Sequence, residues 1–325
     1  MTGVAADMLA DVPLFAALTD TDRAALAGAM ERRSFVGGAA LMVQNDVGDG
    51  LHIVACGTVR VGRRLPGGGF ADTARLGPGN MIGEMALVGR GGRRTATVLA
   101  DGAADTLFLP APAFRAALGQ LRPASLAMQR TLGAELACRA LAKTRDIAGH
   151  LAAQPQAFTP RTAPRHPDPQ PEAAFEPAGF VAKMPLGDAL SPEQQAQLLA
   201  AGKRRNIARG ERLDDDTLWL VVRGALRSDL PLPPGSYQLE VLGPGRLAGA
   251  ASMLAGTVAV NGLAATESSL LLGWDKPAFR ALLAGDDAVA MRLGAAINAD
   301  LVITLDALDG VEARIAAMQR AVAAQ

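Results

Sequence analysis

A carboxylate and an arginine flank a short apolar segment in the first half of the sequence, at a spacing that suits the binding of an anionic group. Gly83 and Glu84 come directly before Met85 and Ala86, and Arg94 follows Glu84 by ten residues. A short helix beginning near Glu84 would direct free backbone N–H groups at a phosphate, and a glycine would let the backbone approach it closely. The planar guanidinium of an arginine matches two phosphate oxygens. The segment therefore predicts a phosphate-binding site.

Simpler interpretations of these residues remain open. Arg94 could be an ordinary cation on a surface strand, and Glu84 could be a solvated carboxylate at the start of a helix. The residue types alone do not decide between these interpretations and a binding role. The sequence shows no nucleophile–base pair, no metal-ligand cluster and no glycine-rich triphosphate loop, so we predict neither an enzyme nor a cofactor.

The two halves of the chain resemble each other, which indicates an internal repeat. Three short segments of the first half recur in the same order about 165 residues later. The pairs are Gly57–Arg60 with Gly224–Arg227, Leu76–Gly79 with Leu242–Gly245, and Phe114–Leu118 with Phe279–Leu283. One such pair could arise by chance, but three in register are typical of a duplicated domain.

A proline-rich segment separates the two copies. Seven prolines lie between Pro155 and Pro177, among polar residues with little apolar surface to pack. The sequence therefore predicts a first domain at 1–153, a linker at 154–178 and a second domain at 179–325.

Each copy has a helix, then many short strands, then a helix. In the first copy apolar spacing predicts a helix over 14–32, and from Phe35 to Leu109 short apolar runs alternate with Gly, Pro, Asn and Asp. A further helical stretch follows at 111–151. The second copy repeats this order, with a helix start at Ser191 and a helical tail that we expect to break near Asp309 and Gly310. The fold class is mainly β, a jelly roll with flanking helices in each half.

The first half resembles the cyclic nucleotide-binding domains of the bacterial catabolite activator and of kinase regulatory subunits. The resemblance is carried by the glycine turns of Asp46–Leu51 and Gly57, by Gly83–Leu87 and by Arg94–Val98. It implies two β-barrels of this type in tandem, without a helix-turn-helix domain. It further implies that Glu84 accepts a hydrogen bond from the ribose 2′-hydroxyl.

The identity of the nucleotide is less firmly indicated. The resemblance implies that Thr95 adds a hydroxyl contact to the phosphate or the base, which is compatible with cAMP or cGMP and favours cAMP. It also implies that the helix after the barrel covers the base, and Thr144 is the nearest hydroxyl residue on that helix. An ordinary exposed helix threonine is the alternative for Thr144.

The second copy lacks the two charged residues. Ala250 stands in the place of Glu84, and the segment Gly256–Asn261, which covers the place of Arg94, contains no arginine. Losing both charge-assisted contacts would cost about 3–6 kcal/mol, or two to four decades of affinity. We therefore predict a second barrel that has lost its ligand and serves as an interaction surface.

Composition narrows the remaining functions. Lys plus Arg and Asp plus Glu both number 32, and this zero balance argues against a dedicated nucleic-acid binder. The start of the chain is not a signal peptide, and no apolar run long enough for a membrane span is evident, so we expect a cytoplasmic protein without a membrane or nucleic-acid partner. Cys56 and Cys138 are interpreted as buried, reduced residues.

The sequence thus favours a non-catalytic cyclic nucleotide receptor that signals through protein contacts, as a homo-oligomer or with an unidentified protein partner. The alternative is a scaffolding subunit that reuses the fold. A transcription regulator would need a helix-turn-helix where the linker and the second copy stand.

Overall fold

The computed structural model describes residues 2–64, 70–153, 177–213, 216–233 and 235–323. The chain divides into two compact units, one of Met1–Leu132 with Ala313–Gln325 and one of Gly133–Glu312. Most of the predicted linker at 154–178 lies outside the described residues, and the predicted domain boundaries stay a prediction.

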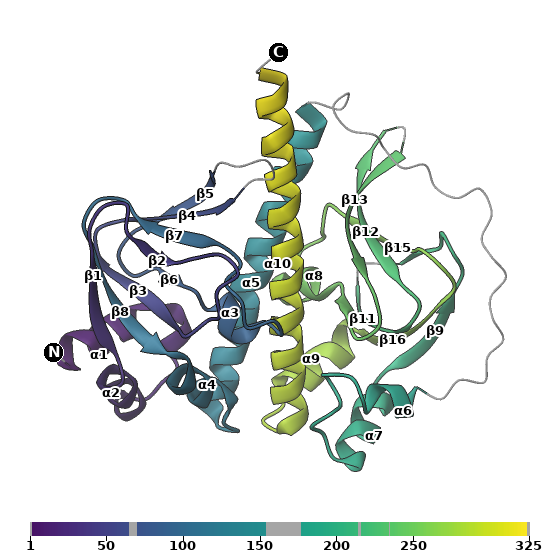
Figure 1. Ribbon diagram of the computed structural model, residues 1–325. Coiled ribbons are helices and arrows are strands. Elements are labelled where there is room, and N and C mark those ends of the chain that lie inside the picture. The colour runs from purple at the N-terminus through teal and green to yellow at the C-terminus, as the bar shows by residue number, and fades with distance from the viewer. Residues whose placement is uncertain (1, 65–69, 154–176, 214–215, 234, 324–325) are drawn as a thin grey trace. The chain divides into compact units, whose positions relative to one another are not determined.

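The first unit contains a jelly roll of two four-stranded antiparallel sheets (Figure 1). One sheet has the order β1-β8-β3-β6 and the other the order β2-β7-β4-β5. The strands are β1 (Glu31–Phe35), β2 (Ala40–Met42), β3 (Gly50–Cys56), β4 (Val59–Arg64), β5 (Phe70–Leu76), β6 (Met81–Ile82), β7 (Thr97–Ala100) and β8 (Ala104–Pro110).

The second unit repeats this topology strand for strand. Its sheets have the orders β9-β16-β11-β14 and β10-β15-β12-β13. The strands are β9 (Lys203–Ile207), β10 (Arg212–Leu213), β11 (Thr217–Arg223), β12 (Leu226–Leu232), β13 (Gly235–Leu242), β14 (Leu247–Ala248), β15 (Gly262–Ala265) and β16 (Ser269–Asp275). The expected fold class, two jelly-roll barrels with flanking helices, is confirmed.

Helices precede and follow each barrel, and one short helix is inserted in it. The first half has α1 (Thr2–Asp11), the 3-10 turn η1 (Pro13–Phe15), α2 (Asp20–Gly28), α3 (Met85–Val88), α4 (Ala111–Gly119) and α5 (Pro123–Ala153). The second half has α6 (Ala178–Val181), α7 (Pro192–Ala200), α8 (Ala250–Ala255), α9 (Lys276–Ala284) and α10 (Ala288–Ala323).

Local sequence explains where the leading helices begin. The side chain of Thr19 accepts a hydrogen bond from the backbone N–H of Asp22, which caps α2. Ser191 forms a full capping box with Gln194 at the start of α7. The corresponding helix starts in the two halves therefore use the same chemistry.

Three expectations about secondary structure and burial are wrong. The predicted helix over 14–32 is split, because Pro13–Phe15 forms a separate turn and Arg32 already belongs to β1. The expected break near Asp309 and Gly310 does not occur, and α10 runs through both residues. Its apolar side keeps the helix packed there, since Leu308 and Val311 are buried.

Both cysteines are free, as expected, but exposed rather than buried. Cys56 is the last residue of β3, and Cys138 lies on an exposed position of α5. Their small apolar character therefore does not serve core packing.

Candidate functional site

Two of the predicted site residues, Gly83 and Glu84, form the turn before α3. Gly83 has a φ of +91°, and Glu84, the N-cap residue of α3, is 3% exposed. The carbonyl of Glu84 accepts hydrogen bonds from the N–H groups of Leu87 and Val88, at 2.9 and 3.1 Å. The N–H groups at the start of a helix point along its axis, in the direction from which an anion would approach.

A backbone ladder places Arg94 opposite this turn. The N–H of Arg94 donates to the carbonyl of Asp46, and the carbonyl of Arg94 accepts from the N–H of Asn45, each at 2.9 Å. The N–H of Gly48 donates to the carbonyl of Gly92 at 2.8 Å. The loop before β7 is thus tied to the loop before β3, and the position of Arg94 is set by main-chain contacts.

The guanidinium of Arg94 lies inside the barrel and is almost fully shielded from solvent. Arg94 is 3% exposed. Its Nη1 donates to the carbonyl of Gly83 at 3.0 Å, and its Nη2 donates to Oδ1 of Asp49 at 2.6 Å. The side chain of Asp49 is 66% exposed, so the counter-charge of a buried cation is a carboxylate on the surface. A phosphate that entered between α3 and Arg94 could replace that carboxylate.

Glycines in the loop before β3 and in the turn before α3 let these elements approach each other. A Cβ at Gly48 would lie 2.7 Å from the Cβ of Ala86, and one at Gly83 would lie 2.5 Å from Nη1 of Arg94. Larger residues at either position would separate α3 from Arg94.

A neutral histidine lies behind the site. His52 on β3 is buried, with Nδ1 2.9 Å from Oγ1 of Thr106. Burial, together with the positive charges of Arg33 and Arg94, lowers the pKa of His52 to about 4. Its ring packs beside Phe108, with ring centroids 5.0 Å apart. His52 is therefore an uncharged, buried side chain that packs next to the site.

The structure brings together six of the seven predicted site residues. Gly83, Glu84, Met85 and Ala86 form the turn and the start of α3, and Arg94 faces that turn. Thr95 follows Arg94, and its hydroxyl donates to Sδ of Met85 at 3.9 Å. Arg94 thus contacts the turn before α3, and Thr95 contacts the first residue of α3.

Thr144 lies in the other compact unit. It is 5% exposed, so it is not the ordinary exposed helix residue that we considered as its alternative. Its hydroxyl donates to the carbonyl of Ala140 at 2.8 Å. Its role as a contact to the base stays a prediction.

Sequence reasoning missed Asp49 as the partner of Arg94. Asp49 lies within the glycine-rich segment that carried the family resemblance, so a carboxylate between two glycines was a visible signal. Its pairing depends on the loop geometry, which places residues 45 apart in the chain within hydrogen-bonding distance.

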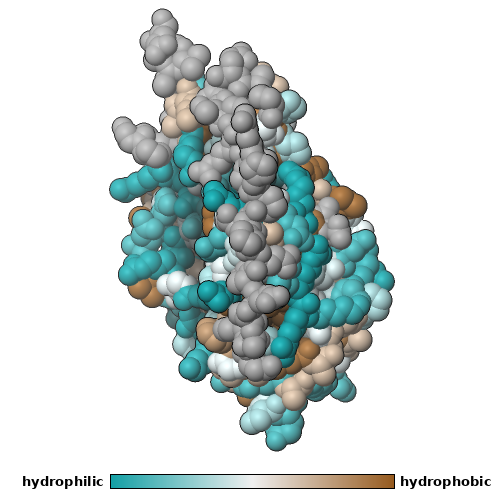
Figure 2. All heavy atoms as spheres, turned by 90° about the vertical axis from the view of Figure 1, so that its right-hand side faces the viewer, coloured by the Kyte–Doolittle hydropathy of each residue, from teal (hydrophilic) through white to brown (hydrophobic). Residues whose placement is uncertain are grey.

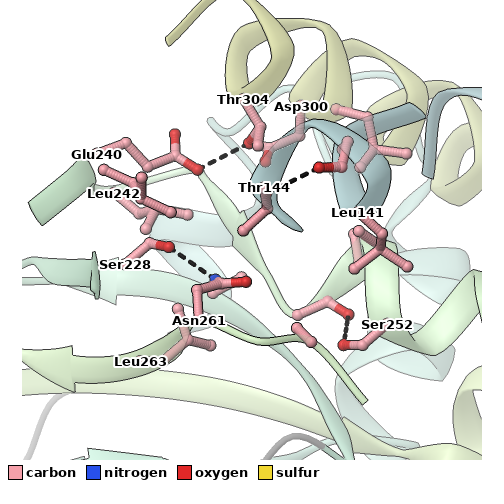
Figure 3. A pocket seen from close by; sticks show the side chains of 18 of the residues that line it. Leu141, Thr144, Ser228, Glu240, Leu242, Ser252, Asn261, Leu263, Asp300 and Thr304 are labelled. Atoms are coloured by element: carbon pink, nitrogen blue, oxygen red, sulfur yellow. Dashed lines mark hydrogen bonds between the residues drawn. The ribbon is translucent and has the colours of Figure 1, made fainter. Parts of the chain in front are cut away.

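The corresponding place in the second barrel is a different kind of pocket (Figure 3). It is lined by residues of β12, β13, β14, β15 and α8, and also by α5 and α10. Gly249 precedes α8 with a φ of +86°, as Gly83 precedes α3. Ala250 and Ala259, three residues before β15, occupy the places of Glu84 and Arg94. The predicted absence of both charged residues is therefore seen in the fold.

Comparison with known proteins gives a family and several relatives. The model of the family described as "Cyclic nucleotide-binding domain" matches residues 32–120. The chain is 32% identical over 113 residues to the cAMP-dependent protein kinase type II regulatory subunit of Drosophila melanogaster, covering 35% of this chain and 30% of the relative. It is 35% identical over 89 residues to the Cyclic AMP receptor protein of Thermus thermophilus, covering 27% and 41%. The chain matches less than half the length of either relative.

Similar solved structures match either most of this chain or less than half of it. The regulatory domain of Toxoplasma gondii PKA with cAMP shares 16% identity, over 88% of this chain and 93% of that chain, with a TM-score of 0.35. The N-terminal domain of a transcriptional regulator from Streptomyces coelicolor A3(2) shares 34% identity, over 43% and 96%, with a TM-score of 0.35. Residues 32–120 of this chain are therefore a cyclic nucleotide-binding domain, homologous to those of kinase regulatory subunits and cyclic AMP receptor proteins.

Proposed function

We propose that the chain is a non-catalytic receptor for a cyclic nucleotide, with one working site in the first barrel. The observation that carries this proposal is the buried guanidinium of Arg94, which donates to the carbonyl of Gly83 before α3 and has an exposed carboxylate as its counter-charge. A ring phosphate fits this arrangement because it offers one negative charge and several acceptor oxygens. Glu84 is then positioned for the ribose 2′-hydroxyl.

We favour cAMP over cGMP as the ligand. Thr95 is compatible with both bases. The printed names of the Drosophila melanogaster and Thermus thermophilus relatives both refer to cAMP, which supports this choice. The signal would pass to protein contacts, within a homo-oligomer or with an unidentified partner.

The second barrel, in this proposal, binds no nucleotide. Its pocket has alanines at the two key positions, and its lining includes the carboxylates of Glu240 and Asp300. Arg246 is already bound to both of those carboxylates. These charges support the loss of the second ligand site.

A scaffolding subunit remains the second candidate. Some large hydrophobic residues are exposed in the second half, including Val241, Val258 and Val260. On the face shown in Figure 2, hydrophobic residues form small groups among hydrophilic ones, which suits a modest contact surface. The shielded Arg94 is not needed by a purely structural protein, which favours the receptor.

Within the part of the chain that the structure describes, one helix meets the length and composition of a membrane span. It is Ala288–Gln319 within α10, and 72% of its apolar window is buried inside the structure. A buried core helix passes the same test, so α10 is weak evidence for a membrane. A cytoplasmic protein without membrane or nucleic-acid partners stays our prediction.

Calorimetry with cAMP, cGMP and 2′-deoxy-cAMP tests the proposed receptor function on the full chain. We expect cAMP to bind, and 2′-deoxy-cAMP to bind about 10- to 100-fold more weakly because one hydrogen bond to a carboxylate is lost. Glu84→Gln should reduce this discrimination, and Glu267→Gln, which changes an exposed carboxylate, should preserve it. Absence of binding by cAMP and cGMP would refute the proposal.

A further inference from the structure

The pocket of the second barrel contains part of helix α5. Ala140, Leu141 and Thr144 of α5 line it together with residues of the strands and of α8. In Figure 3, Leu141 and Thr144 lie in the same pocket as Leu242 of β13 and Ser252 of α8. The cavity volume open to the centre of a water molecule is about 60 Å³. That is room for a few water molecules rather than for a nucleotide.

The polar groups in this pocket are bound to each other. Asn261 donates to Ser228 at 2.8 Å, and Thr304 of α10 donates to Glu240 at 3.0 Å. Thr144 donates to the carbonyl of its own helix, and Ser252 donates to the carbonyl of Gly249 at 3.0 Å. These four donors are thus committed to protein acceptors, and Figure 3 marks the bonds Thr304–Glu240 and Asn261–Ser228 with dashed lines between labelled residues.

A close contact at Gly133 brings α5 against α8 and α10. A Cβ at this position would lie 2.7 Å from Oδ1 of Asn298 and 3.3 Å from Cδ1 of Leu254. Asn298 is 1% exposed, so its side chain has little room to move away. Glycine is a poor helix former, and its presence inside a 31-residue helix is explained by this approach.

An ion-pair cluster joins α5 to α10 at Lys143, about one helical turn after Ala140. Nζ of Lys143 lies 2.7 Å from Oδ1 of Asp309 and also pairs with Glu312, both on α10. The three side chains are 15–24% exposed. Because they are largely shielded, their attraction is stronger than that of a surface pair.

The start of α5 is anchored in the first unit. Oγ of Ser125 donates to the carbonyl of Ala117 at 2.6 Å, and Nε2 of Gln129 donates to that of Leu118 at 3.2 Å. Both acceptors belong to α4, which directly follows the first barrel. One continuous helix therefore leaves the nucleotide-binding domain and ends in the second unit.

We propose that the former ligand pocket of the second barrel has become a docking site for the 133–151 segment of α5. The second unit then restrains the helix that leaves the nucleotide-binding domain. The docking itself requires no ligand, whereas its use in signalling rests on the proposed function. A nucleotide in the first barrel would act on this docked helix only by favouring one of its positions over another.

Two glycine substitutions in α5 test the docking in the ligand-free full chain by amide hydrogen exchange. Gly149 is exposed, with no atom within 4 Å of an added Cβ, so Gly149→Ala should slow exchange in α5 through better helix propensity. Gly133→Ala adds the same methyl group but overpacks the contact with Asn298. We expect about tenfold faster exchange over 136–151 and in α8, with β3 and β8 unchanged. Docking is refuted if Gly133→Ala slows exchange as Gly149→Ala does.

A second pair of variants probes the same contact without changing the backbone. Lys143→Met should speed exchange over 136–151 and near Asp309, because it leaves two carboxylates without their shielded cation. Lys183→Met, at an exposed position, is the matched control. Equal exchange in these two variants would contradict a contribution of the ion-pair cluster to docking.

Adding cAMP separates the docking from the proposed function. If calorimetry shows binding, we expect the exchange of 136–151 to change on saturation, and this change to be reduced in Gly133→Ala. Binding without any change in that segment overturns the signalling role of the docked helix while leaving the receptor intact. If cAMP does not bind, the receptor proposal fails, and the two glycine variants still decide the docking.

Discussion

Arg94 combines a buried charge with an exposed partner, and this combination sets the energetics of the site. A guanidinium shielded from water needs a counter-charge, which Asp49 supplies at 2.6 Å. A bound phosphate would exchange one anion for another rather than bury a new charge. Gly83, Glu84 and Arg94 could be recognised in the sequence as candidate site residues. The pairing of Asp49 with Arg94 could not be predicted, because it arises only when the chain folds.

His52 makes the stability of the first barrel depend on pH. Its pKa is lowered to about 4 by burial and by neighbouring cations, against 6.5 for an exposed histidine. Between pH 4 and pH 6.5 the unfolded chain binds more protons than the folded one. The contribution of His52 to the free energy of unfolding is therefore fully present above pH 6.5 and is lost as the pH falls towards 4. The loss is about 3 kcal/mol.

His52→Phe should remove this part of the pH dependence, since phenylalanine fits an aromatic environment and carries no proton. Chemical denaturation at pH 7 and pH 4.5 measures this pH dependence as the difference between the free energies of unfolding at the two pH values. His150→Phe changes an exposed histidine and should keep the wild-type slope. An unchanged slope in His52→Phe would show that other groups control acid stability.

The positions at which helices start were the features of the elements most easily predicted from the sequence. The continuity and packing of the long helices were the hardest to predict. Thr19 and Ser191 mark the starts of α2 and α7 because capping is local chemistry. The continuity of α10 through Gly310 depends on packing of its buried side, which local propensity does not report. The same holds for α5, whose second half lies in the other unit.

The turn before α3 depends on a glycine for both its backbone and its space. Gly83→Ala would place a Cβ 2.5 Å from Nη1 of Arg94 at a φ of +91°. We expect the free energy of unfolding to fall by about 1–3 kcal/mol, with weaker cAMP binding because Arg94 is displaced. Thermal or chemical denaturation and calorimetry measure the two effects.

Gly91→Ala is the control for this substitution, since no atom lies within 4 Å of its added Cβ and its φ is ordinary. It should leave stability and binding close to the wild type. If both variants behaved alike, the conformation of the turn before α3 would not matter for the site.

At the scale of the whole molecule, duplication followed by divergence explains the two halves. The strand order is the same in both barrels, and glycines with positive φ recur at Gly57 and Gly224. The repeat and the fold class were predictable because the segments recur in register. The new use of the second pocket was not, because Thr144 and Gly133 are far from it in sequence and reach it only through the packing of α5.

The number of nucleotides bound per chain tests the central claim most directly. Titration calorimetry of the full chain with cAMP should give one site, and Arg94→Ala should weaken it by at least about 10- to 100-fold through loss of a charge-assisted contact. Arg115→Ala, which removes an exposed arginine from α4, should bind as the wild type does. Two sites per chain, or binding by Arg94→Ala equal to that of Arg115→Ala, would contradict a single working site in the first barrel.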